Sequence, residues 1–177
     1  RIRSGKKILP ISVNLSRASI HYDNMICRYV KIVEENGIPF SSVPIELTET
    51  AALYNDQISK LIEEMVDAGF KLHMDDFGSG YSSMTSLNQL PFDTLKLDKS
   101  LIDYIENFRG QQVIRHTISL AHSLGMKVLA EGVEKAKQVE ILRSLNCDEI
   151  QGFYYARPLS WENFETEVIR AKGACKK

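Results

Sequence analysis

Short apolar runs alternate with longer stretches of helical periodicity along this chain. The six runs are residues 8–14, 43–49, 70–76, 94–100, 127–133 and 150–155. Runs of this length, bounded by polar residues or glycine, are typical of buried strands. An alternation of strands and helices predicts an α/β fold with a parallel sheet, whose central strands are apolar on both faces and are covered by helices.

The stretches between the runs carry their apolar residues at helical spacing. The stripe in residues 55–70 comprises Ile58, Leu61, Ile62, Met65 and Val66, and that in residues 110–125 comprises Val113, Ile114, Ile118, Ala121 and Leu124. Glycines at 37, 69 and 125 are predicted to end three helices in a left-handed conformation. Near the C-terminus, residues 160–172 predict a closing helix with Ser160 as its N-cap and Trp161 turned inward.

Each apolar run ends in residues able to coordinate a ligand or transfer a proton. They are Asn14, Glu46 with Glu49, Asp75 with Asp76, Lys96 with Asp98, Glu131 with Glu134, and Gln151. An open doubly wound sheet gathers ligand residues at one switch point, whereas in a barrel all the strand ends meet at one mouth. The distribution over all six runs favours a barrel.

The length of the chain limits how much of a barrel it can form. A (β/α)8 TIM-type barrel takes about 250 residues and eight strands, whereas this chain has 177 residues and six strand candidates. We therefore expect one domain over residues 1–177, with about six of the eight units present and the N-terminal units missing. Both edge strands would then be open, which predicts self-association or poor solubility.

Composition excludes several classes of partner and site. The net charge is −1, with 22 basic and 23 acidic residues interspersed, so we expect neither a nucleic-acid polymer nor a membrane surface as partner. The cysteines are three and widely spaced, which indicates no disulfide framework and fits a cytoplasmic protein. No apolar stretch approaches the ~20 residues that span a bilayer.

Asp75 and Asp76 are adjacent acids at the end of one run. Consecutive strand residues point to opposite faces, so both carboxylates can face one site only if the chain leaves the strand between them. We expect Gly78 and Gly80 to permit that turn. Taken singly, an acid at a strand end is more often a helix cap or a solvated surface group. The convergence of several acids favours a functional site.

Six segments of the sequence resemble, in order and spacing, motifs of the EAL-domain family, the cyclic di-GMP phosphodiesterases. They are "SVNLS", "IELTET", "DDFGSGYSS", "LPFDTLKLDKS", "LGMKVLAEGVE" and "CDEIQGFYYARP". The Glu-Ala-Leu motif that names the family is absent from the chain. A second departure is Lys135, at a position that is usually threonine in the family.

The resemblance implies a role for each candidate residue. It implies that Asn14, Glu46, Asp75, Asp76 and Glu131 bind Mg²⁺ or Mn²⁺, which prefer such oxygen donors. Lys96 matches the catalytic lysine that orients or deprotonates the attacking water, and Gln151 matches a glutamine that helps hold water and substrate. Glu131 is counted among the catalytic residues as well as among the metal ligands. Glu49 would anchor the loop after Asp76, and Asp98 would support the site without binding metal.

Two functions remain open at this point. The resemblance implies a bacterial phosphodiesterase that hydrolyses cyclic di-GMP to linear pGpG, although we expect this chain alone to be almost inactive. The alternative is a non-catalytic cyclic di-GMP receptor or protein-interaction domain on the same barrel. In either case the resemblance implies upstream sensory or GGDEF domains, and a dimer formed through the loop after Asp76 and the helix after Lys96.

Overall fold

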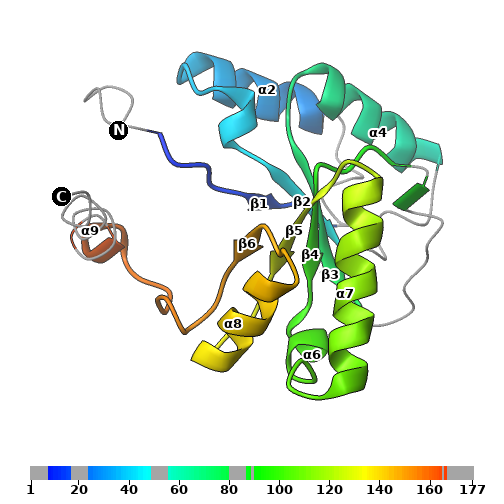
Figure 1. Cartoon of the computed structure of the whole chain (residues 1–177). Coiled ribbons are helices and arrows are strands. Elements are labelled where there is room, and N and C mark those ends of the chain that lie inside the picture. The colour runs from blue at the N-terminus through cyan, green and yellow to red at the C-terminus, as the bar shows by residue number, and fades with distance from the viewer. Residues whose placement is uncertain are drawn as a thin grey trace.

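Six parallel strands form a single sheet in the order in which they occur along the chain (Figure 1). The computed structural model describes residues 8–16, 24–48, 56–79, 87–88, 90–164 and 166. Within them the strands are β1 (Val13–Asn14), β2 (Ile45–Thr48), β3 (Leu72–Phe77), β4 (Thr94–Leu97), β5 (Lys127–Ala130) and β6 (Glu149–Ile150). This strand order never reverses, as in a TIM-type barrel and unlike a doubly wound sheet.

Helices follow most of the strands and lie against one side of the sheet (Figure 1). They are α2 (Met25–Glu35), α4 (Asp56–Asp67), α6 (Lys99–Ile102), α7 (Phe108–Ser123), α8 (Ala136–Ser144) and α9 (Trp161–Asn163), together with the 3₁₀ turn η2 (Phe40–Ser42). The predicted glycine stops are confirmed, because Gly37, Gly69 and Gly125 have φ angles of 60°, 96° and 79°. Ser160 caps α9, since its Oγ accepts from the Asn163 amide at 3.4 Å.

The hydrophobic core lies between the sheet and the helices. Its centre is built by alternate strand residues that are completely buried: Ile45, Leu47, Leu72, Met74, Leu95, Leu97, Val128 and Ala130. Buried residues of the helices, such as Ile62, Met65, Ile114 and Leu142, pack with them. Because side chains alternate along a strand, the residues between these core positions face the other side of the sheet.

Several expectations about burial and strand ends are wrong in detail. The central strands are apolar on one face only, and their other face carries Glu46, Asp75 and Lys96. Strand β6 ends at Ile150, so residues 151–155 are a turn outside the strand. Four residues expected to face inward are exposed: Val66 (38%), Val113 (52%), Leu124 (45%) and Trp161 (46%).

Candidate functional site

Lys96 is the centre of a buried charge cluster at the carboxyl end of the strands. Its Nζ lies 2.8 Å from Glu46 Oε1, 2.9 Å from Asp75 Oδ1 and 2.9 Å from Glu131 Oε1. Glu46, Asp75 and Lys96 point from β2, β3 and β4, and Glu131 follows β5 directly. Four neighbouring strands therefore each contribute one charged side chain to a single point.

The cluster is shielded from solvent and its charges are tightly coupled. Only 4% of Lys96 is exposed. Burial alone lowers the pKa of Lys96, but its three carboxylate partners outweigh burial and raise that pKa above its ordinary value. In the absence of cations Lys96 is therefore an ammonium ion.

Asp76 turns toward the site through an irregularity within β3, whereas a turn at the following glycines was expected. Strand β3 continues through Asp75 and Asp76 to Phe77, and its register against β4 shifts between Met74 and Phe77. Asp76 itself has a φ of 57°, the left-handed conformation that Asp tolerates better than most residues. This irregularity brings the side chains of two consecutive residues to one side of the sheet. Gly78, with a φ of 95°, follows it, and Gly80 lies outside the described residues.

Asp75, Asp76 and Glu131 form a triad of acids that can hold a metal ion. Their carboxylate oxygens lie within 4.8 Å of one another. Burial, followed by the charge of Asp75, raises the pKa of Asp76. Burial also raises the pKa of Glu131, although the hydrogen bond and charge of Lys96 oppose this effect. With Glu46, the site carries four carboxyl groups against one ammonium. This surplus of oxygen donors and negative charge fits a hard divalent cation such as Mg²⁺ or Mn²⁺.

Two further candidates lie at the same end of the sheet. Asn14 ends β1 and pairs in register with Glu46, and its side chain is exposed. Gln151 follows β6, and its amide donates to Ala130 O at 2.8 Å, directly before Glu131. The Gln151 side chain is also exposed. Both residues therefore border the cluster without belonging to its buried part.

Of the residues expected to support the site, Asp98 and Gly78 lie within the described part of the chain. Asp98 is the N-cap of α6, because its Oδ1 accepts from the Ser100 amide at 2.9 Å. A Cβ on Gly78 would overlap the side chain of Leu101, so the glycine permits close approach between β3 and α6. Glu49 lies outside the described residues.

Sequence reasoning missed one buried polar residue beside the site. Gln138, only 4% exposed, binds the loop that carries Glu131. The signal was present in the sequence, because a glutamine three residues after a helix N-cap is half of a capping box. The sequence analysis did not identify this capping box, because its N-cap position is occupied by Lys135 and lysine is not a capping residue.

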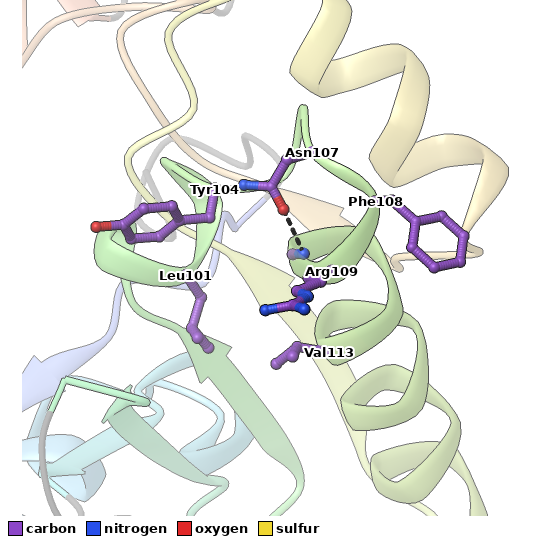
Figure 2. A pocket seen from close by; sticks show the side chains of 7 residues that line it. Leu101, Tyr104, Asn107, Phe108, Arg109 and Val113 are labelled. Atoms are coloured by element: carbon purple, nitrogen blue, oxygen red, sulfur yellow. Dashed lines mark hydrogen bonds between the residues drawn. The ribbon is translucent and has the colours of Figure 1, made fainter.

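An apolar hollow of about 650 Å³ lies on the outer surface where α6 leads into α7 (Figure 2). Its walls include Leu101, Tyr104, Phe108 and Val113. Phe108 is 75% exposed and Tyr104 is 65% exposed, which is unusual for large apolar side chains so close together. Asn107 Oδ1 accepts from the Gly110 amide at 2.7 Å and holds the turn between these aromatic residues (Figure 2).

Comparison with known proteins gives consistent matches over most of the chain. Residues 1–158 match the family model described as EAL domain. The chain is 35% identical over 170 residues to the cyclic di-GMP phosphodiesterase NbdA of Pseudomonas aeruginosa, covering 95% of this chain and 22% of NbdA. The chain spans about a fifth of the length of the curated relatives it matches.

Solved structures agree with this match. The c-di-GMP complex of the PaMucR phosphodiesterase has a TM-score of 0.84 at 29% identity, covering 92% of this chain and 67% of that one. The manganese/cy-diGMP complex of Klebsiella pneumoniae BlrP1 at pH 9.0 has a TM-score of 0.80 at 31% identity, covering 84% and 39%. Separately, none of the helices in the described ranges has both the length and the apolar character needed to cross a bilayer.

Proposed function

Because the chain belongs to the EAL domain family, we propose that it is the C-terminal part of a phosphodiesterase barrel that hydrolyses cyclic di-GMP to linear pGpG. The observation that carries this proposal is the convergence of four carboxylates around buried Lys96. Such a site suits a phosphodiester, because the substrate is anionic and its hydrolysis is commonly assisted by two divalent cations.

In this proposal the acidic residues hold Mg²⁺ or Mn²⁺ and so position the substrate phosphate. Asp75, Asp76 and Glu131 are the ligands supported by their mutual distances, and Glu46 and Asn14 complete the set. Bound cations would neutralise charge on the phosphoryl oxygens and acidify a coordinated water. Hydrolysis forms one P–O bond to the water oxygen and breaks one P–O bond of the ring, and the departing ribose oxygen receives a proton.

Lys96 and Gln151 are proposed to act on the water and the substrate. Lys96 lies within hydrogen-bonding distance of three of the carboxylates, so a water held by them would also be within its reach. There it can orient that water as an ammonium ion, or deprotonate the water if bound cations take over the carboxylates and so lower the pKa of Lys96. Gln151 borders the loop of Glu131 with an exposed amide side chain, which is free to contact a substrate.

The same family membership supports a proposal about assembly and context. We propose a homo-oligomer formed through the apolar hollow of Leu101, Tyr104, Phe108 and Val113, or through the open edges at β1 and β6. Sensory or GGDEF domains upstream and a cytoplasmic location belong to the proposal as well. We propose that the 177-residue chain alone turns substrate over slowly or not at all, because among the described residues β1 and β6 each pair with only one neighbouring strand and the barrel is not closed.

The second candidate is a receptor that binds cyclic di-GMP without cleaving it. The observation in its favour is that Asn14 and Gln151, at the border of the cluster, are both exposed. In this candidate the two side chains would bind the nucleotide without placing a water in line for attack, and hydrolysis depends on that placement. A receptor would bind the nucleotide with all its carboxylates intact and release it unchanged.

Calorimetry with cyclic di-GMP in Mn²⁺, together with chromatography of the nucleotide after long incubation, tests the proposal. We expect Mn²⁺-dependent binding that Asp75→Asn and Glu131→Gln abolish and that Glu140→Gln, an exposed acid on α8, leaves unchanged. Formation of pGpG supports the phosphodiesterase. Binding without cleavage, also in the full-length protein, supports the receptor. Binding that is equally strong in Asp75→Asn would overturn both.

A further inference from the structure

Gln138 is a buried residue of α8 that connects two segments next to the site. Its Oε1 accepts from the Glu134 amide at 2.9 Å and from the Lys135 amide at 3.0 Å. Its Nε2 faces Ile102 O of α6 at 3.5 Å, a long contact inside the core. One side chain therefore joins the loop after β5 to the short helix that follows Lys96.

The loop after β5 is the segment that sets the position of Glu131. The Glu131 amide donates to Leu97 O at 3.0 Å, and Val133, which is completely buried, donates to Gln151 O at 3.1 Å. Between them Gly132 has a φ of 65°, and a Cβ there would lie 2.6 Å from the Lys99 side chain. The loop turns sharply within a few residues. The hydrogen bonds of Gln138 to the end of the loop therefore restrict the orientation of Glu131.

The N-terminal cap of α8 depends on Gln138, because the side chain of the N-cap residue accepts no hydrogen bond. Lys135 is the N-cap, and an ammonium group has no lone pair with which to accept a hydrogen bond. Its Nζ instead lies 3.1 Å from Glu106. The backbone amides of Glu134 and Lys135 thus rely on one buried oxygen, and losing that oxygen leaves both amides without their partner.

We propose that Gln138 is a positioning residue, which fixes Glu131 relative to Lys96 by holding the loop after β5 against α6. It acts through Glu131 and does not touch the metal or the substrate. This inference rests on the proposed function, because it takes Glu131 as a metal ligand. Residues that orient ligands from outside commonly change metal affinity by about 10–100-fold when they are replaced.

Mn²⁺ binding to the purified protein, measured by electron paramagnetic resonance, tests the inference without any assay of turnover. We expect Gln138→Leu to weaken Mn²⁺ binding by about tenfold. Gln138→Glu retains an acceptor for both loop amides but loses the Nε2 donor that faces Ile102 O, so we expect it to lose less Mn²⁺ affinity than Gln138→Leu. In a Glu131→Gln background, Gln138→Leu should have no further effect, because its action passes through Glu131.

Val139→Ala is the matched control, since Val139 is a buried neighbour on the same helix and its backbone amide, which donates to Lys135 O at 3.3 Å, is retained by alanine. It should lower stability to denaturant and leave Mn²⁺ affinity unchanged. If Val139→Ala weakens Mn²⁺ binding as much as Gln138→Leu, or if Gln138→Leu binds Mn²⁺ like the wild type while Glu131→Gln does not, Gln138 has no positioning role. Unchanged binding in Glu131→Gln overturns Glu131 as a ligand and this inference with it. If Gln138→Leu does not fold, Gln138→Glu takes its place in the measurement. A loss of Mn²⁺ affinity in Gln138→Glu that is just as large in the Glu131→Gln background would overturn the inference.

Discussion

Lys96 on β4 reaches the carboxylate of Glu46 on β2 at 2.8 Å, across the intervening strand β3. Two residues on strands that are not neighbours can meet in this way only where the sheet curves toward them. Asp75, on the strand between, meets the same ammonium at 2.9 Å. The curvature of the sheet thus gathers charges from separate strands, which is why the cluster needs a barrel-like arrangement of strands.

Removing the ammonium should destabilise the metal-free protein. Lys96→Met leaves Glu46, Asp75 and Glu131 crowded with no positive partner, which commonly costs about 3–5 kcal/mol. We expect urea denaturation to show that loss without metal, and added Mn²⁺ to restore most of it. Lys60→Met, which removes a lysine with a 79% exposed side chain, is the control and should change stability by less than about 0.5 kcal/mol. Equal stability of the two variants would show that the carboxylates do not need Lys96.

Gly152 should not tolerate a side chain. A Cβ there would overlap the backbone of Val133 in the loop after β5, so Gly152→Ala must separate that loop from the turn after β6. We expect a loss of about 2–4 kcal/mol of unfolding free energy and weaker Mn²⁺ binding. Gly125→Ala meets no atom within 4 Å and should lose only about 1 kcal/mol from its left-handed backbone. Similar losses in both variants would mean that the contact with Val133 is not rigid.

Much of the arrangement was predictable from the order of residues along the strands. Leu72, His73, Met74 and Asp75 alternate apolar and polar side chains, and the same alternation at Thr94–Leu97 shows that Lys96 shares a face with its polar neighbours. Taking these runs as apolar on both faces missed this alternation. The gathering of acids at strand ends was inferred correctly because parallel strands present all their carboxyl ends at one edge.

The remaining details depend on tertiary contacts that no local pattern contains. The left-handed backbone of Asp76 arises inside β3, where the strand shifts register against β4, and not at the glycines that follow. The turn at residues 151–155 reads as an apolar strand because its aromatic residues are strand formers, yet its backbone bonds return to Val133. Gln138 was missed because a lysine at the N-cap of α8 does not indicate a helix start, and here the start depends on a hydrogen bond to a buried glutamine.

Lys135→Thr should stabilise the protein. Lys135 has the extended backbone of an N-cap, with φ −118° and ψ 143°, and threonine there could accept from the Gln138 amide. The replacement loses the pair with Glu106, which is exposed on both sides and contributes little. We expect a gain of about 1 kcal/mol in unfolding free energy by thermal and urea denaturation. Lys137→Thr, which removes the other lysine near Glu106 without reaching the N-cap, should give no gain.

Asp148 should make stability depend on pH in the acidic range. Partial burial alone raises the pKa of Asp148, but hydrogen bonds from His122 and from the Val128 amide, each 2.8 Å long, outweigh burial and lower it below 3.8. A carboxyl with a lowered folded pKa stabilises the protein above its unfolded pKa, and this contribution is lost as pH falls through the folded pKa. Asp148→Asn should therefore be less stable than the wild type at pH 6, and the difference should shrink below pH 4. A difference that stays constant over urea titrations from pH 6 to pH 3 would contradict this linkage.

The exposed aromatic hollow should decide how the protein associates in solution. Phe108 and Tyr104 present large apolar surfaces beside Leu101 and Val113, and a second copy covering them would remove that area from water. We expect Phe108→Ser to shift the molar mass from light scattering toward the monomer at micromolar concentrations. Ile32→Ser, which replaces a 57% exposed apolar residue on α2, is the matched control and should leave the mass unchanged. If Phe108→Ser associates as strongly as the wild type, we expect copies to meet through β1 and β6 instead, because among the described residues each of these strands pairs with one neighbour and leaves backbone groups available to another chain.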